Sequence, residues 1–163
     1  MNGSDLPARV SVRTFKPGDE EAFRKLNEAW ISKYFRLEEK DHEVLNNPLS
    51  YVLYPGGQIF MAVRDEEPVG CCALIPMEDG SFELAKMAVA EQQQGQGIGR
   101  KLLNGAIEYA KSRSIRRLYI ETNSSLSNAI HLYESSGFRH VPPELIQPSP
   151  YARADVHMEM TLF

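Results

Sequence analysis

The sequence predicts an α/β (α+β) fold in which four helices flank a mixed, mostly antiparallel sheet of about seven strands. Two short apolar stretches, 59–63 and 69–75, are separated only by the polar turn 64–68, which is typical of a hairpin. Elsewhere, strand-like stretches alternate with segments whose apolar residues have helical spacing. Hairpins and strand–helix–strand crossovers in one chain indicate a mixed sheet.

The first strand is expected at 9–13, where polar and apolar residues alternate. Pro17 and Gly18 then break the strand pattern. Asp19 follows them and is placed to cap a helix that begins at Glu20.

In that helix Phe23, Leu26 and Trp30 recur on one face. We therefore expect its aromatic side chains in the core and not stacked on a cofactor. A short second helix is expected within 32–47, and its acidic face is expected to be solvated.

After the hairpin, a fourth strand is expected at 82–89 and a fifth at 118–122. Between them a helix is indicated by an apolar stripe of Leu102, Leu103, Ala106, Ile107 and Ala110. A fourth helix is expected from about Ser127, its cap, to Ser136, with Gly137 just after its end.

Three segments complete the chain: a short strand at 138–141, a proline-rich arm at 142–150 and a last strand at 157–162. The 163 residues suit a single domain, residues 1–163, that is long enough to bury a substantial core. Its 42% hydrophobic and 25% charged residues are those of a soluble globular protein.

Composition also excludes several classes of protein. A formal charge of −4 without a basic run argues against nucleic acid as a partner. No apolar run is long enough for a membrane span. Residues 1–7 lack the basic and apolar regions of a signal peptide.

Cys71 and Cys72 are adjacent, a spacing that rarely allows a disulfide, and a cytoplasmic setting fits them best. A nucleophilic cysteine is the less favoured interpretation, because free cysteine is usually buried. The four histidines show no metal-ligand spacing, so we predict no metal.

The stretch 94–100 is the strongest signal in the sequence. Gly95, Gly97 and Gly99 alternate between a strand pattern and a helical pattern. Glycine allows close approach of the backbone to a ligand, and the first N–H groups of a helix attract anions. The stretch is therefore predicted to bind a phosphate or pyrophosphate. A dinucleotide-binding motif would need a glycine where Arg100 stands, and no P-loop string occurs.

The pattern Q-x-x-G-x-G, from Gln94 through Gly97 to Gly99, resembles the acetyl-coenzyme A signature of the GNAT superfamily of N-acetyltransferases. The predicted element order also matches the GNAT fold, and the resemblance covers roughly Val10 to Leu162. It implies acetyl-CoA as cosubstrate. The residues that it implies for coenzyme binding are Met87, Ala88, Val89, Gln94, Gly95, Gln96, Gly97, Ile98, Gly99, Arg100, Asn123, Asn128 and Tyr133.

Glu83 is the candidate general base. The segment from Glu83 to Val89 is similar to the pattern E-x-x-x-x-A-V of histone-acetylating members of the family, in which a glutamate stands at this place. Many members of the family lack this base and use an ordered water, so the choice between Glu83 and water stays open. The alternative is a glutamate at the end of a strand whose head group reaches water. Lys86 should point to the opposite face of the strand unless a bulge intervenes, and its role is left open.

Tyr133 is the candidate general acid. The segment from Asn128 to Phe138 resembles the family pattern N-x-x-x-x-Y-x-x-x-G-F, whose tyrosine lies beside the coenzyme sulfur. The alternative is a core tyrosine on the same helical face as Ile130. The resemblance further implies that the fourth strand is splayed from the fifth and that an N–H near Met87–Val89 meets the thioester oxygen.

Arg100 is expected to contact phosphate, and Lys101 is expected to be plain surface. Together these features predict an enzyme that transfers an acetyl group from acetyl-CoA to a primary amine by direct attack in a ternary complex. The acidic cluster of Glu38, Glu39, Asp41 and Glu43 can attract a cationic amine, which favours a small molecule as acceptor. The acceptor site is expected to involve Tyr34, Phe35, Glu38, Tyr151 and Arg153.

Three other functions stay open: acetylation of a protein or peptide amine, a catalytically silent acyl-CoA-binding module, and an ordinary nucleotide-binding domain. The last of these is disfavoured by the missing third glycine and by the hairpin that precedes the motif. The sequence does not decide whether the chain forms a homodimer.

Overall fold

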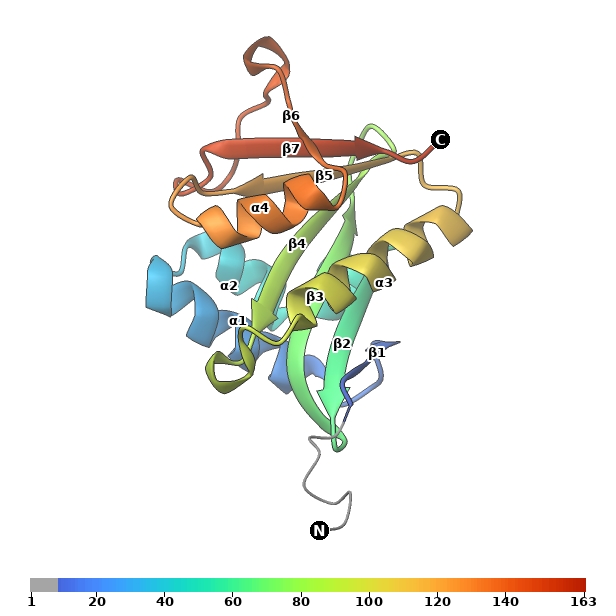
Figure 1. The fold of residues 1–163 in the computed structure, drawn as a ribbon, viewed down its shortest axis with the longest axis vertical. Helices are drawn as coiled ribbons and strands as arrows, with labels where there is room; N and C mark the ends of the chain where they lie inside the picture. Colours follow the sequence, from blue (N-terminus) through green and yellow to red (C-terminus); the bar gives the residue numbers. More distant parts are fainter. Residues whose placement is uncertain (1–8) are drawn as a thin grey trace.

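A seven-stranded sheet runs through the computed structural model, which describes residues 9–163 (Figure 1). Its strand order is β1-β2-β3-β4-β5-β7-β6. Neighbouring strands are antiparallel, except for β4 and β5, which are parallel. The predicted mixed sheet and order of elements are thus confirmed. The strands are β1 Ser11–Thr14, β2 Gln58–Arg64, β3 Glu67–Pro76, β4 Phe82–Val89, β5 Arg117–Thr122, β6 Arg139–His140 and β7 Val156–Thr161.

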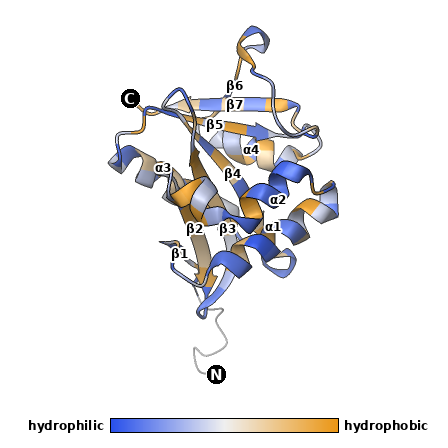
Figure 2. Ribbon diagram, turned by 180° about the vertical axis from the view of Figure 1, so that it is seen from behind, coloured by the Kyte–Doolittle hydropathy of each residue, from blue (hydrophilic) through white to orange (hydrophobic). Residues whose placement is uncertain are grey.

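Helices cover both faces of the sheet: α3 and α4 lie on one face, and α1 and α2 lie on the other (Figures 1 and 2). Their bounds are α1 Glu20–Tyr34, α2 Glu39–Asn46, α3 Ile98–Ser112 and α4 Ser127–Ser135. Short helical turns that the sequence analysis did not predict are η2 Leu49–Leu53, η3 Glu91–Gln93 and η4 Pro143–Leu145. Within residues 9–163, no helix has the length and apolar character needed to cross a membrane.

Each face of the sheet has its own apolar core. Along β3, Cys72 and Leu74 pack with α3, whereas Cys71 and Ala73 pack on the side of α1 and α2. Both cysteines are free and fully buried, and burial raises the pKa of the Cys71 thiol to about 12. A thiol in this environment is not a nucleophile at neutral pH, which disfavours a covalent acyl-cysteine.

The parallel pair β4 and β5 is joined over only two residue pairs, Phe82 with Leu118 and Glu83 with Tyr119. Beyond Glu83 the two strands are no longer paired, although β4 continues to Val89. The sheet therefore has the splay that the family resemblance implied.

A β-bulge lies in the splayed half of β4. Lys86 and Met87 together face the single residue Cys72 of β3, and Lys86 has a φ of 56°. The extra residue changes which side chains share a face. Lys86 consequently lies with Glu83 on the side of α1 and α2, not on the opposite face that unbroken alternation would give.

Two predicted helix caps differ in the structure. Asp19 precedes α1, but its carboxylate binds the Arg13 guanidinium at 2.7 Å and the Lys16 N–H at 2.7 Å and makes no cap. Ser127 is the first residue of α4 and not its cap, which is Leu126.

Residues with positive φ angles form two of the turns. Gly137, with a φ of 107°, follows the end of α4 as predicted. The turn between β2 and β3 is shorter than the predicted 64–68, because Asp65 and Glu66 both adopt positive φ and let the strands pair up to Arg64 and Glu67. The predicted absence of a signal peptide at 1–7 lies outside the described residues.

Candidate active site

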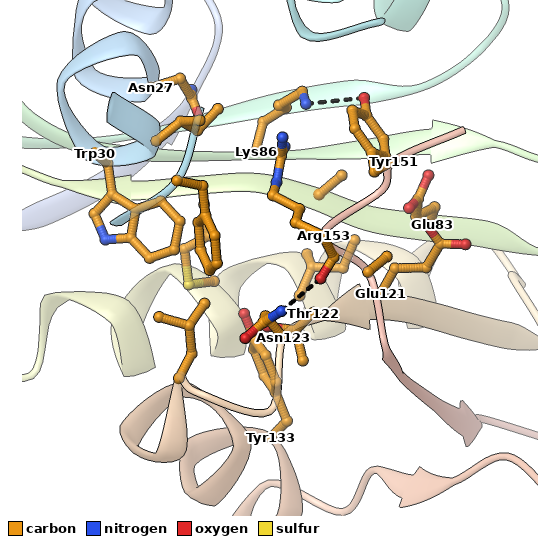
Figure 3. A pocket seen from close by; sticks show the side chains of 17 residues that line it. Asn27, Trp30, Glu83, Lys86, Glu121, Thr122, Asn123, Tyr133, Tyr151 and Arg153 are labelled. Carbon is orange, nitrogen blue, oxygen red and sulfur yellow. Dashed lines mark hydrogen bonds between the residues drawn. The ribbon is translucent and has the colours of Figure 1, made fainter. Parts of the chain in front are cut away.

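A cavity of about 100 Å³ lies where β4 and β5 separate. Its walls come from α1, from both strands, from Leu126 and Tyr133, and from the segment 142–155 that leads into β7, which is called the arm below (Figure 3). A second cavity of about 160 Å³ reaches Val89 and Gln94 beside the glycine turn. The two cavities share Trp30, Met87, Thr122, Leu126 and Tyr133. They therefore form one slot that leads from the glycine turn to Glu83.

Trp30 packs against the core below α1, as expected, and it also lines both cavities. Its ring lies 6.5 Å from that of Phe35, another residue of the cavity wall. Tyr34, by contrast, is 43% exposed and does not line this slot.

The glycine turn presents backbone N–H groups. Gly95 and Gly97 have φ angles of 80° and 79°, and Gly97 is the N-cap of α3. Within residues 9–163, the N–H groups of residues 95–100 make no hydrogen bond. A Cβ at Gly99 would make only ordinary contacts, at 3.5 Å from Leu132 and 3.8 Å from Met87. Packing therefore does not require glycine at this position, whereas a phosphate held by the N–H groups would.

Side chains hold the turn in shape. Gln94 donates to the Val89 carbonyl at 3.1 Å, and Arg64 binds the side-chain oxygens of Gln93 and Gln96, the latter at 2.8 Å. These bonds link the turn to β2 and to the end of β4, so its backbone is already positioned before a ligand binds.

The two basic residues that open α3 both have partners. Arg100 donates to the Ser135 hydroxyl at 3.0 Å and so joins α3 to α4. Lys101 donates to the Val10 carbonyl at 3.2 Å. Lys101 is exposed, as expected, and its hydrogen bond also links the start of α3 to the residue before β1.

Glu83 is a carboxylate without a hydrogen-bond partner within residues 9–163, and it lines the cavity. Burial, and then the negative charge of Glu121, raise its pKa to about 7. A group that titrates near neutral pH can accept a proton under physiological conditions, as a general base must.

Tyr133 is 92% buried, its ring meets that of Phe138 edge to face, and it lines both cavities. Its hydroxyl has no hydrogen-bond partner within residues 9–163, and burial raises its pKa to about 12. At neutral pH the hydroxyl is therefore protonated and able to donate into the slot.

A buried ion cluster closes the other side of the cavity. The fully buried Asp41 of α2 accepts from Lys86 Nζ at 2.6 Å and from both terminal nitrogens of Arg153 at 2.7 Å. Arg153 also binds Glu38 at 3.1 Å, and Lys86 donates to the Tyr151 hydroxyl at 2.9 Å. Burial alone would raise the pKa of Asp41, but the hydrogen bonds from Arg153 and the charge of Lys86 hold it at about 2.

The cluster changes two expectations. The acidic face of α2 is not simply solvated, because Asp41 is its most buried residue. Tyr151 and Arg153 line the cavity as expected, whereas Glu38 lies behind Arg153. Lys86 and Asp41 were not expected there, because only the bulge and the packing of α2 bring them together.

The remaining predicted coenzyme residues lie in different surroundings. The side chains of Ala88 and Ile98 are in the core, so only their backbone could reach a ligand. Asn123 donates to the Arg153 carbonyl at 2.7 Å and thereby holds the arm. Asn128 is exposed on the first turn of α4 and lines neither cavity. Coenzyme contacts by these side chains stay predictions.

Glu121 of β5 is a cavity residue that the sequence analysis missed. It is a carboxylate inside a largely apolar strand, a feature that it shares with Glu83 and that could have identified it. Within residues 9–163, no group of three or more metal-ligating side chains gathers. The predicted absence of a metal stays a prediction.

A model of the acetyltransferase (GNAT) family matches residues 20–138. The chain belongs to this GNAT family. It is therefore an acyltransferase, and the GNAT resemblance of its sequence is confirmed. Its specific motifs, 83–138, lie inside the matched region.

Two N-acetyltransferases match this chain along most of their length. The N-acetyltransferase YjgM of Escherichia coli, described as uncharacterized, is 30% identical over 83% of this chain and 85% of its own. The uncharacterized N-acetyltransferase C1271.07c of Schizosaccharomyces pombe is 27% identical over 88% of this chain and 91% of its own. The mycothiol acetyltransferase of Acidothermus cellulolyticus is 29% identical over 83% of this chain, but only 46% of its own length is covered.

Solved structures show the same fold. A GNAT acetyltransferase from Staphylococcus aureus superposes with a TM-score of 0.85 over 95% of this chain and 100% of its own, at 21% identity. A GNAT acetyltransferase from Elizabethkingia anophelis was solved with acetyl-CoA bound. It superposes with a TM-score of 0.70 over 94% of this chain and 98% of its own, at 25% identity. Both support the predicted GNAT architecture.

Gly99→Glu should lower the affinity for coenzyme A at least about tenfold, because a carboxylate in the first turn of α3 would repel a pyrophosphate. Asn104→Glu adds the same charge at an exposed position of the same helix and should leave the affinity unchanged. Isothermal titration calorimetry measures both, and thermal unfolding checks that the variants fold. Equal affinities for the two variants would contradict coenzyme binding at this turn.

Asp41→Asn should reduce the free energy of unfolding by about 3–5 kcal/mol at pH 7, because it leaves buried Lys86 and Arg153 without their shared counterion. The pKa of Asp41, about 2, lies below the value near 3.9 of an unfolded aspartate. The stabilisation is thus complete above about pH 4 and is lost as the pH falls toward 2, so the two proteins should converge there.

Urea unfolding at several pH values measures this difference. Glu38→Gln is the matched control, since Glu38 is 23% exposed and its amide replacement can still accept from Arg153. The loss of unfolding free energy in Glu38→Gln should be much smaller than in Asp41→Asn. Equal losses in the two variants would show that Asp41 contributes no more to stability than Glu38 does.

Proposed function

We propose that the protein is an N-acetyltransferase that transfers an acetyl group from acetyl-CoA to a primary amine of a small molecule by direct attack in a ternary complex. One observation carries the proposal. A carboxylate, Glu83, and a hydroxyl, Tyr133, both without partners within residues 9–163, face a single slot that begins at a glycine turn with unpaired N–H groups.

Bound acetyl-CoA supplies an activated acetyl thioester. The unpaired N–H groups of residues 95–100 would bind its pyrophosphate, and the splayed half of β4 offers a backbone with no strand partner toward β5. In the proposed complex, an N–H near Met87–Val89 donates to the thioester oxygen, where negative charge develops during attack.

Glu83 is proposed as the general base. An ammonium group has no lone pair, and an alkylamine titrates near 10.4, so its proton must leave before attack. Glu83, with a pKa of about 7, is ionised in an appreciable fraction at neutral pH and can take this proton, directly or through a water.

Tyr133 is proposed as the general acid that protonates the departing thiolate as the carbon–sulfur bond breaks. The second proton, which the nitrogen loses on becoming an amide, restores the Tyr133 hydroxyl through solvent. Its position on α4 places it in the part of the slot that both cavities share. Since its hydroxyl is not used by the protein within residues 9–163, it can serve the reaction without loss of a structural bond.

The shape of the acceptor side supports a small molecule over a protein chain. The cavity around Glu83 is about 100 Å³, and Tyr151, Arg153 and Ala154 of the arm form one wall. Asp41 binds the side chain of Arg153 and Asn123 binds its carbonyl, and both contacts fasten that arm. A polypeptide segment would require the arm to move, whereas a compact amine would not.

Glu83→Gln should lower kcat/KM about 10²-fold or more, because the amide cannot accept the proton. In the wild-type enzyme, kcat/KM should rise with pH and include a step near pH 7 as Glu83 ionises, and the variant should lack this step. Glu78→Gln, at an exposed position before β4, is the control. An unchanged pH profile in Glu83→Gln would identify another base.

Tyr133→Phe should lower kcat about 10²-fold or more, with little change in coenzyme affinity. The melting temperature should stay the same, because the hydroxyl makes no hydrogen bond within residues 9–163 that the substitution could remove. Tyr109→Phe on α3, remote from the slot, is the control. A variant with intact turnover would show that Tyr133 only packs.

A further inference from the structure

Glu121 is a buried carboxylate without a lysine or arginine partner within residues 9–163. Its side chain is 10% exposed and lines the same cavity as Glu83. It accepts from the Ser149 hydroxyl at 2.6 Å and from the Tyr119 hydroxyl at 3.1 Å, and both of these donors are neutral. His157 Nδ1 is 3.9 Å away and lies within 2.6 Å of the Tyr119 hydroxyl.

The cationic side chains of the cavity are already paired. Lys86 and Arg153 both bind Asp41, and Arg153 also binds Glu38. Their positive charges are thus balanced by two carboxylates, and Glu83 and Glu121 remain as a surplus of negative charge. Figure 3 shows these two glutamates side by side, on neighbouring strands, at one end of the cavity.

Surplus buried charge is costly unless a ligand neutralises it. In the proposed reaction, Glu83 takes the proton of the reacting amine and becomes neutral. Glu121 takes no part in this proton transfer, and the two hydroxyl groups that bind it are neutral, so neither supplies a counter-charge. A second cation would therefore stabilise both the bound state and the transition state.

We infer that Glu121 binds a second positively charged group of the acceptor, so that the substrate class is an aliphatic amine with another cationic nitrogen, such as an α,ω-diamine. This inference rests on the proposed function, since it assigns Glu83 to the reacting amine. The apolar walls, which include Trp30, Ile31 and Phe35, suit the methylene groups between the two nitrogens. A carboxylate in place of the second nitrogen would be repelled by Glu121.

A purely structural role for Glu121 would be to fasten the arm through Ser149. Two variants separate this role from cation binding. Glu121→Gln removes the charge but keeps an oxygen that can accept from the Ser149 hydroxyl. Ser149→Ala removes the tie to the arm but keeps the charge.

Acceptors of matched length provide the first test: 1,4-diaminobutane, butylamine and 4-aminobutanoate, with release of coenzyme A measured for the full-length enzyme. The wild-type enzyme should have its highest kcat/KM with the diamine and its lowest with 4-aminobutanoate. The ratio of kcat/KM for the diamine to that for butylamine should fall at least about tenfold in Glu121→Gln and persist in Ser149→Ala.

Two results of these assays would overturn the inference and leave the proposed function in place. One is a wild-type enzyme that uses butylamine as well as the diamine. The other is a ratio that is unchanged in Glu121→Gln, or that falls equally in both variants.

Binding provides a test that is independent of turnover. Calorimetric titration of 1,4-diaminobutane into the enzyme with coenzyme A should show at least about tenfold weaker binding to Glu121→Gln than to wild type. If no amine in a broad screen is acetylated, the proposed function fails, and this titration still decides the role of Glu121. Equal binding to both proteins would refute the cation site.

Discussion

The separation of β4 from β5 is the constraint on which the candidate site depends. Two residue pairs hold these parallel strands together, and the pairing stops at Glu83 and Tyr119. Past this point, the backbone of β4 has no strand partner toward β5, in the centre of a sheet where such groups are normally paired. The gap admits side chains from both strands and connects to the glycine turn. A fully paired sheet would have buried the same backbone and left no slot for a thioester.

The gap is bounded on one side by charges that neutralise each other. Lys86 from the bulge of β4 and Arg153 from the arm line the gap, and both bind Asp41 of α2, so three distant segments meet at one carboxylate. Bidentate pairing with Arg153 and full burial make this contact geometrically specific. The cluster fixes the position of the arm over the cavity, and it removes two positive charges that would otherwise oppose a cationic acceptor.

Three polar groups in the slot are distinguished by their surroundings. Glu83 lacks donors, and burial raises its pKa to about 7. Glu121 accepts hydrogen bonds from two neutral hydroxyl groups, those of Ser149 and Tyr119. Tyr133 sits among apolar side chains, and burial raises its pKa to about 12. Groups in different environments can serve different tasks, and under the proposed function Glu83 takes a proton, Glu121 binds a cation and Tyr133 gives a proton.

The sequence by itself determined the order of elements, the glycine turn and the candidates Glu83 and Tyr133, because periodicity, turn residues and motif spacing are local properties of the chain. It also predicted that Tyr151 and Arg153 belong to the acceptor site. Only the tertiary structure decided that Lys86 shares a face with Glu83. One extra residue in β4 reverses the alternation of side chains between the two faces, and no local sequence pattern predicts this bulge. The burial of Asp41, the role of Lys101 and the surplus charge of Glu121 likewise depend on which distant segments pack together. Such contacts join residues far apart in the sequence, such as Asp41 and Arg153, and their spacing along the chain does not predict that they meet.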